Sequence, residues 1–298
     1  MDFKEFTDEI LKEVTEMAGD IFRAGITRNL KNNGVERTAI TATAPQWRGS
    51  PNIYLEEFYE EYKSEDRGIG GIAGEVYQQL MEHMDDLKGV RLDGLQKWDE
   101  ARPRIYAKLI NFENNIELLK WKPYRKFLDL AAVYYVQVEG FKDGGTGAFL
   151  VNDSHMSVWG QTEESLYSAA VQNMRLLGEP VFESMEKILG QEFQPLLPAS
   201  VPAARMYVLT NRKKIFGAAE LLDNGTLKQV SDELGGDFIV LPSSLHECII
   251  LPADGTLSYQ KLADMVADVN INAVSIEERL SDHVYLYGRE EGALRIAA

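Results

Sequence analysis

Five side chains in two short stretches are of types that could carry nucleophilic or acid–base chemistry. Asp153 and His155 follow an expected strand end, a place where ligands often gather in open sheets. Ser243, Ser244 and His246 lie in an expected connection between two strands. Carboxyl, hydroxyl and imidazole groups are the groups that hydrolases use for proton transfer and attack. These five are the candidate catalytic residues, although turn formation and backbone capping explain the same residue types, and we favour that interpretation.

A further pair, His246 and Cys248, lies two residues apart at the edge of an expected strand, so both side chains would share one face. Such a pair could form a thiolate and an imidazolium. Cys248 opens the apolar run Cys-Ile-Ile-Leu, however, and a cysteine in such a run usually behaves as a small buried hydrophobe. We favour an inert cysteine. Because it is the single cysteine of the chain, internal disulfides and paired-cysteine zinc sites are excluded.

No common enzyme motif is present in the sequence context that its chemistry requires. Residues 68–73 match the loose dinucleotide pattern G-x-G-x-x-A, but the charged residues 60–67 before them cannot form the buried strand that this chemistry requires. The phosphate-binding loop G-x-x-x-x-G-K-[ST], the serine elbow G-x-S-x-G and the zinc motif H-E-x-x-H are absent. We therefore expect no cofactor and no metal.

The charge balance limits the partners. The net charge is −16, and residues 1–100 hold 12 basic against 21 acidic residues. The electrostatic field of a negatively charged protein repels phosphate backbones and anionic membrane surfaces. We therefore do not expect nucleic acid as a partner. Basic and aromatic residues alternate between 97 and 126, where we expect the cations to neutralise the protein's own acidic residues. No apolar run reaches the ~18–20 residues of a membrane span. With the acidic, amphipathic start and the lone cysteine, this predicts a cytoplasmic protein.

The first hundred residues predict a helix-rich, acidic N-terminal lobe with one β-hairpin. Asp2 and Glu5 have capping-box spacing, and apolar residues then recur every three or four positions as far as Phe22, which predicts a helix stopped by Gly25. Asn32-Asn33-Gly34 is typical of the turn of a hairpin formed by residues 26–30 and 37–43. Further helices are expected over 52–63 and 72–87, joined by a Gly-rich linker at 67–71.

The remaining residues, 101–298, mix helices and strands without regular alternation. Strands are expected over 105–111, 128–138, 147–151, 205–211, 237–241, 247–251 and 284–287. Helices are expected over 94–101, 114–121, 162–177, 180–189, 218–234 and 259–269. This pattern predicts an α+β fold, in which helices pack on an antiparallel or mixed sheet.

Several segments carry a family resemblance. They are the start MDFKEFTDEI, FLDL at 127–130, RMYVLTN at 205–211, GAA at 217–219 and IVLPSSLHE at 239–247. In order and spacing they resemble the uncharacterised domain of unknown function 5688 over essentially the whole chain. The strand–helix–strand–strand order of the third quarter distantly resembles family 1444. The resemblance implies one full-length intracellular unit with an α+β fold, and it supplies no activity, cofactor or catalytic residue.

Three functions stay open. The favoured one is a non-catalytic binding or regulatory protein that docks another protein through its acidic N-terminal lobe. The first alternative is a hydrolase-type enzyme in which Asp153, His155, Ser243, Ser244 and His246 converge in one cleft. The second is an acidic immunity- or mimic-type inhibitor, although a charge of −16 over 298 residues is dilute for a mimic of nucleic acid. Whether the protein is an enzyme is undecided.

Overall fold

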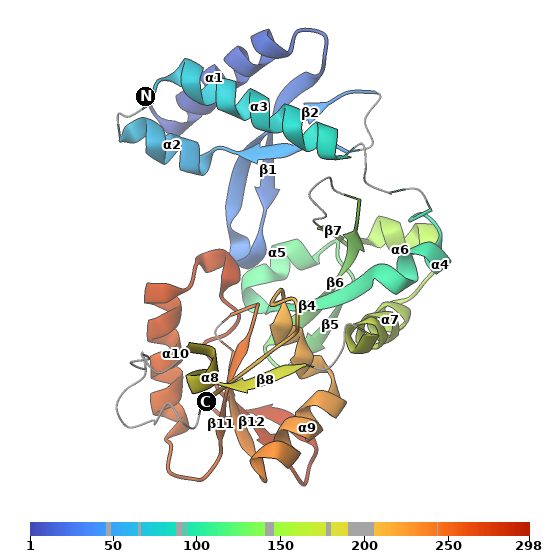
Figure 1. Cartoon of the computed structure of the whole chain (residues 1–298), viewed down its shortest axis with the longest axis vertical. Coiled ribbons are helices and arrows are strands. Elements are labelled where there is room, and N and C mark those ends of the chain that lie inside the picture. Colours follow the sequence, from blue (N-terminus) through green and yellow to red (C-terminus); the bar gives the residue numbers. More distant parts are fainter. Residues whose placement is uncertain are drawn as a thin grey trace. The chain divides into compact units, whose positions relative to one another are not determined.

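A computed structural model describes residues 1–45, 49–64, 67–87, 92, 94–140, 146–176, 180–189, 206–242 and 244–298. Its contacts divide the chain into two compact units. The first consists of Met1–Gly94 with Gln137–Ala148, and the second of Leu95–Val136 with Phe149–Ala298. Figure 1 labels their helices and strands. The boundary that the sequence places at residue 100 stays a prediction.

The first unit is a small antiparallel sheet with helices packed on it. Its elements are α1 (Phe3–Ala18), β1 (Arg23–Leu30), the 3₁₀ helix η1 (Asn32–Gly34), β2 (Glu36–Thr43), β3 (Asn52–Tyr54), α2 (Glu56–Lys63) and α3 (Ile69–Leu87). The strand order is β1-β2-β3. The register places Ile40 opposite both Ile26 and Ile53. The predicted hairpin turn at 32–34 is confirmed.

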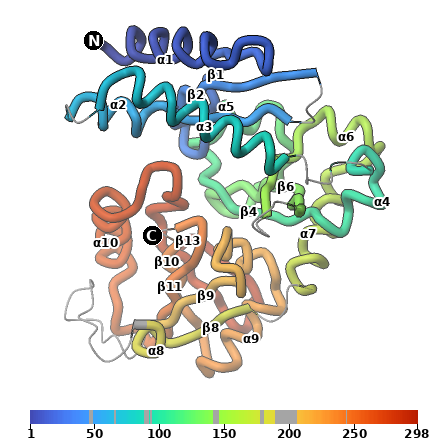
Figure 2. The backbone as a smooth tube through the Cα atoms, turned by 45° about the horizontal axis from the view of Figure 1, so that its top comes forward, coloured from blue at the N-terminus to red at the C-terminus, as the bar shows by residue number. Residues whose placement is uncertain are grey.

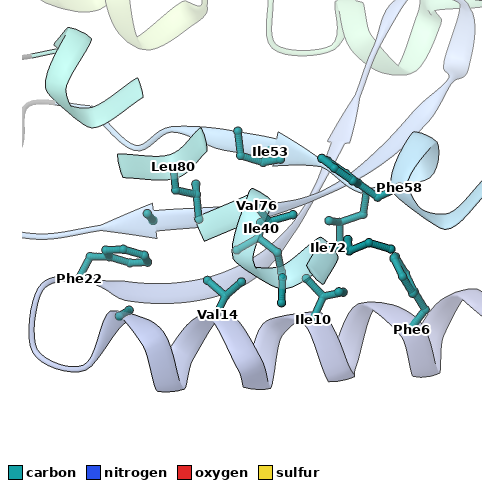
Figure 3. Packing of buried hydrophobic residues seen from close by; sticks show 14 of the residues in the cluster. Phe6, Ile10, Val14, Phe22, Ile40, Ile53, Phe58, Ile72, Val76 and Leu80 are labelled. Carbon is teal, nitrogen blue, oxygen red and sulfur yellow. The ribbon is translucent and has the colours of Figure 1, made fainter. Parts of the chain in front are cut away.

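Residues spaced three or four apart on α1 form the core of this unit. Phe6, Ile10 and Val14 are completely buried and face Ile40 of the sheet and Val76 of α3 (Figure 3). Asp2 begins α1 with the predicted capping box, because its carboxylate accepts the Glu5 N–H while the Glu5 side chain accepts the Asp2 N–H. The periodic pattern therefore identified the packing face correctly.

Several boundaries in this unit were wrong, including the start of the first strand, which is Arg23 rather than Ile26. The first helix ends at Ala18 rather than at Phe22, because Gly19 at φ +49° turns the chain and residues from Arg23 onward pair in β1. The helix expected over 52–63 begins at Glu56, since Asn52–Tyr54 pairs with β2 as β3. The expected linker at 67–71 is partly helical, because α3 begins at Ile69.

The second unit contains a smaller and a larger antiparallel sheet. The smaller sheet has the order β4-β6-β5, with β7 also paired to β6. Its strands and neighbouring helices are α4 (Trp98–Ala101), η2 (Arg102–Arg104), β4 (Ile105–Asn111), η3 (Glu113–Asn115), α5 (Ile116–Leu119), β5 (Tyr124–Phe127), β6 (Leu130–Val138), β7 (Gly147–Leu150), α6 (Asp153–Trp159) and α7 (Glu163–Leu176). The last residues of β6 and the first of β7 belong to the first unit.

The larger sheet has six strands in the order β13-β12-β10-β11-β9-β8. Its elements are β8 (Val181–Ser184), α8 (Met185–Leu189), β9 (Tyr207–Thr210), η5 (Gly217–Leu222), α9 (Asn224–Leu234), β10 (Phe238–Leu241), β11 (Cys248–Pro252), α10 (Tyr259–Ala273), η6 (Ile276–Glu278), β12 (Tyr285–Gly288) and β13 (Ala293–Ile296). Leu262 and Val266 of α10 pack with Ile239 and Leu241 on one face. Helices α9 and α10 lie on opposite sides of this sheet (Figures 1 and 2).

The predicted α+β class with antiparallel sheets is confirmed, but one element was misassigned. The helix expected over 180–189 begins instead as a strand, because Val181–Ser184 pairs antiparallel with β9 and the helix is confined to Met185–Leu189. Two strands, Tyr124–Phe127 and Ala293–Ile296, escaped prediction. Neither strand contains a buried residue, so neither shows the apolar alternation of a half-buried strand.

Candidate functional site

The predicted residues Ser244 and His246 are bound into a tight corner of the second unit. The buried Ser244 hydroxyl accepts the His246 N–H at 3.0 Å. The His246 carbonyl accepts the Thr210 hydroxyl at 2.7 Å, and its Nδ1 accepts the Phe216 N–H at 3.3 Å. The imidazole also stacks on the Phe216 ring, with centroids 5.6 Å apart. Ser243 lies outside the described residues.

Close backbone packing explains why these segments need particular residues. Phe216 has φ +53°, a conformation that side-chain-bearing residues rarely adopt. A Cβ atom on the next residue, Gly217, would collide with the Thr210 hydroxyl, the His246 carbonyl and the Asn211 nitrogen. The segments that carry the family resemblance around 205–211, 217–219 and 239–247 thus meet at one point. The favoured interpretation, turn architecture, accounts for each of these contacts.

The other predicted pair, Asp153 and His155, forms the first turn of α6. Asn152 caps this helix: its side chain accepts the His155 N–H, and His155 Nδ1 accepts the Asn152 N–H, both at 3.1 Å. The imidazole stacks on Trp159. Burial lowers the pKa of His155, and the positive charge of Lys122 lowers it further. His155 is therefore neutral at ordinary pH, with one ring nitrogen already used by the backbone.

In the described residues, the hydrogen bonds and ring contacts of Asp153 and His155 share no residue with those of Ser244 and His246. The convergence of all five candidates in one cleft stays a prediction. Cys248 is fully buried, and burial strongly raises the pKa of its thiol, which disfavours the thiolate. The interpretation of Cys248 as a core residue is confirmed.

A cluster of Asp129, Ser281, His283 and Tyr285 was not predicted. Asp129 accepts hydrogen bonds from the Ser281 hydroxyl and the Tyr285 hydroxyl, both at 2.6 Å, and its carboxylate lies 3.1 Å from His283 Nδ1. In a Ser-His-Asp triad the serine lies at the ring nitrogen opposite the aspartate. Here the serine lies 3.3 Å from the same Nδ1 that faces the aspartate, so the cluster does not activate a nucleophile.

The most unusual site is a pair of buried carboxyl groups, Glu220 and Asp223, which are 7 % and 8 % exposed. Both lie where η5 meets α9. The run Gly217–Leu222 is entirely buried, which brings the Glu220 side chain inside with its apolar neighbours. Asp223 is then the N-cap of α9, a position that aspartate favours. Sequence reasoning missed the pair, although one acid within an otherwise apolar run is a recognisable signal.

Asp223 is well satisfied by donors. It accepts the N–H groups of Gly225 and Thr226 at 3.3 Å, the Thr226 hydroxyl at 3.2 Å and the Arg175 guanidinium at 2.5 Å. Burial acts to raise its pKa, but the hydrogen bond and charge of Arg175, together with the helix N–H groups, outweigh burial and lower the pKa below its usual value. Asp223 is therefore ionised and neutralised by its surroundings.

Glu220 lacks such partners. In the described part of the chain, its hydrogen bond is the one from the Thr226 hydroxyl, at 3.5 Å. That hydroxyl has a single proton and lies nearer to Asp223, so it cannot serve both carboxylates. Burial, followed by the negative charge of Asp223, raises the pKa of Glu220 to about 7. The structure thus contains a buried carboxyl group without a donor of its own.

The two carboxyl groups line a hollow of about 340 Å³ between the end of α7 and the start of α9. The lining residues are Met174, Arg175, Pro180, Glu220, Asp223, Gly225, Thr226 and Gln229. The Arg175 side chain is 63 % exposed, so the hollow reaches solvent there. Small-molecule sites are concave, with a few polar groups among apolar ones, and their volumes begin near ~300 Å³. This hollow meets that description.

Across the ranges that the structure describes, no three His, Cys, Asp or Glu side chains are grouped so as to hold a metal ion. Within the same residues, no helix combines the length and the apolar character needed to cross a bilayer.

Comparison with known proteins identifies a family and no activity. The family of unknown function DUF5688 matches residues 3–289, nearly the whole chain, so the protein belongs to that family. The distant likeness to family 1444 stays an expectation. No curated protein and no solved structure matches the chain.

Proposed function

We propose that this member of a family of unknown function is a non-catalytic binding protein whose second unit binds a cationic nitrogen group of its ligand at Glu220. The observation that supports the proposal is a carboxyl group, 7 % exposed, that lines a hollow without a donor of its own in the described residues. An unpaired buried charge is costly, whereas a charge-assisted hydrogen bond is strong. A bound ammonium or guanidinium group would supply both the missing donor and the missing charge.

The surroundings of Asp223 favour binding over catalysis. General acid–base chemistry by two carboxyl groups requires that both be free to exchange protons with substrate. Asp223 is instead occupied by the N-terminus of α9 and by Arg175. Thr226 is the one hydroxyl-bearing residue of the described lining, and its hydroxyl contacts both carboxyl groups.

A titration with n-butylammonium chloride tests the proposal. By isothermal calorimetry near pH 8, we expect millimolar binding to the wild-type protein and binding about tenfold weaker, or none, to Glu220→Gln, which retains the shape and loses the charge. Glu186→Gln, which removes an exposed carboxylate, should bind as the wild type does. Equal binding to wild type and Glu220→Gln, or no binding to the wild type, would contradict the proposal.

The hydrolase-type alternative has one observation in its favour. A group with a pKa of about 7 is suited to general acid or base catalysis at neutral pH. It predicts hydrolysis of ester, amide or glycoside substrates with a rate that changes near pH 7 in the wild type and is lost in Glu220→Gln. Absence of Glu220-dependent turnover across those three substrate classes would reject it.

We also propose that the acidic first unit docks another protein, and that the protein is cytoplasmic. The outer face of α1 supports the docking proposal: Asp8, Glu9 and Glu16 are exposed there, and residues 1–100 carry 12 basic against 21 acidic residues. A partner with a basic surface would complement this charge. The presence of a single cysteine, the buried Cys248, supports the cytoplasmic location, which cell fractionation tests.

The docking experiment compares full-length proteins. The partner captured by wild type should be lost when Asp8, Glu9, Glu13 and Glu16 are replaced by their amides, and the capture should weaken at about 0.5 M NaCl. A control removes the exposed carboxylates of Glu186, Glu290 and Glu291. Capture that is equally reduced by both sets, or by neither, counts against docking through α1. A nucleic-acid-binding partner released in this way would instead support the mimic-type inhibitor.

A further inference from the structure

Building on the proposed cation site, we propose that the ligand is a zwitterion of amino-acid size, whose ammonium group is bound by Glu220 and whose carboxylate is bound by Arg175. The hollow contains a second charged group, Arg175. A cation alone would require only Glu220, but the lining also contains a guanidinium group, which is the side chain best shaped to bind a carboxylate.

The contact with Asp223 uses only part of the hydrogen-bonding capacity of Arg175. Its contact in the described residues is made by one terminal nitrogen, which donates to Asp223 Oδ1 at 2.5 Å. A guanidinium group presents five N–H donors in a fixed plane, so the remaining donors can bind a second carboxylate while that contact persists. Because the side chain is 63 % exposed, a ligand can reach it from solvent.

Asp223 fixes the distance between the two ligand-binding groups. Arg175 contacts its Oδ1, and the Thr226 hydroxyl lies 3.2 Å from its Oδ2 and 3.5 Å from Glu220 Oε2, which places the two carboxyl groups side by side. The Arg175 guanidinium and the Glu220 carboxyl group therefore lie on either side of the Asp223 carboxylate. One small molecule can span that distance. The positive charge of Arg175 offsets the charge of Asp223, and three uncharged donors further stabilise its carboxylate, which reduces its repulsion of a ligand carboxylate.

The size and lining of the hollow restrict the rest of the ligand. A volume of about 340 Å³ is near the lower limit for small-molecule sites, which fits a free amino acid better than a peptide or a nucleotide. Met174 and Pro180 offer apolar contacts, and Gln229 offers one amide. We therefore expect an amino acid with an aliphatic or small polar side chain.

The test compares amino acids with amines that differ only by the carboxylate. The probes are L-leucine, L-methionine and L-glutamine, each with its decarboxylated amine: 3-methylbutylamine, 3-(methylthio)propylamine and 4-aminobutanamide. Calorimetry on the wild-type protein should show at least one amino acid binding about tenfold tighter than its own amine, as expected for an added charge-assisted contact. This comparison requires no variant.

Two variants then assign the groups. Arg175→Ala should reduce the affinity for the amino acid to that of its amine without weakening the binding of the amine, because the variant removes a positive charge beside the cation site. Glu220→Gln should weaken both. Arg212→Ala, which removes an exposed arginine elsewhere in the unit, should change neither.

The inference is overturned if no amino acid binds more tightly than its amine, or if Arg175→Ala weakens both probes alike. Glu220-dependent binding of amines without a preference for amino acids would overturn the zwitterion and retain the cation site. No Glu220-dependent binding at all would overturn both.

Discussion

At Glu220, one carboxyl group is buried without the partners that its neighbour Asp223 possesses. Asp223 accepts four donors, while Glu220 shares a single hydroxyl with it. The two pKa values accordingly move in opposite directions. Titratable groups with such divergent environments cluster at functional sites. For this reason we place the proposed binding site at this pair and not at the histidines.

Glu220 should make the stability of the protein depend on pH. Its pKa rises from 4.5 to about 7 on folding, so between those values the folded state binds more protons than the unfolded state. The unfolding free energy therefore falls as pH rises through this window, by about 3 kcal/mol once ionisation is complete, at about 1.4 kcal/mol per pH unit. Urea unfolding at about pH 5 and pH 8 measures the loss.

The control for this prediction is Glu220→Gln, which cannot ionise. Between about pH 5 and pH 8, the stability of the variant relative to wild type should rise by about 2.5 kcal/mol, because every other titrating group is common to both proteins. An identical pH dependence in the two proteins would show that Glu220 titrates as an ordinary carboxyl group.

At the scale of elements, the junction between η5 and α9 builds the site, and the adjoining corner around His246 holds η5 in place. The N–H of Ala218 donates to the Leu245 carbonyl, and Thr210 donates to the His246 carbonyl. Ser244 and His246, two of the candidate catalytic residues, thus make hydrogen bonds that hold this corner together, while Glu220, the acid within an apolar run, lines the hollow.

Replacing Gly217 by alanine should be strongly destabilising. The new methyl group would collide with the Thr210 hydroxyl and the His246 carbonyl, and neither can move without breaking the hydrogen bond between them. We expect a loss of about 3 kcal/mol or more in urea unfolding. Gly236→Ala is the matched control, because nothing lies within 4 Å of the added atom. Equal effects of the two substitutions would contradict the packing described here.

Two substitutions of the N-cap residue Asp223 should distinguish how much its hydrogen bonds and its negative charge each contribute to stability. Asp223→Ala removes the acceptor for the first N–H groups of α9, whereas Asp223→Asn retains an acceptor and removes the negative charge. We expect the alanine variant to be about 1–2 kcal/mol less stable than the asparagine variant in urea unfolding at neutral pH. Similar stability of the two variants would mean that the cap contributes little.

At the scale of the whole molecule, the composition and periodicity of the sequence were enough to predict much of the fold. The α1 face, the hairpin turn at 32–34 and the strand 105–111 were predicted correctly, because each is specified by local spacing or by turn chemistry. The strand 181–184 was missed because its pairing with β9 involves residues distant in sequence, which override local preference.

The candidate site could not be predicted for a related reason. Glu220, Asp223 and Thr226 are neighbours in the sequence, but Arg175 is 48 residues from the carboxylate that it contacts. The burial of Glu220 depends on how η5 packs, and the sequence shows only an acid among apolar residues. The same limit applies to Asp129 and His283, which are 154 residues apart.

The net charge of −16 should make the stability of the whole molecule depend on salt. Self-repulsion destabilises a compact acidic protein, and it is screened as the Debye length falls from about 20 Å at low salt to below about 5 Å at 0.5 M. We expect the Tm, measured by calorimetry, to rise by a few degrees over that range of NaCl. The variant with the four acids of α1 neutralised should show a smaller rise. A Tm that falls with salt would contradict this prediction.

NMR can observe the Glu220 carboxyl group itself. In protein labelled with ¹³C at glutamate side chains, NMR titration should reveal one carboxyl group with a pKa of about 7, absent from Glu220→Gln and shifted to lower pH by n-butylammonium. Glutamate signals that all titrate near the usual value of about 4.3, or a high-pH signal that the amine leaves unchanged, would contradict the account.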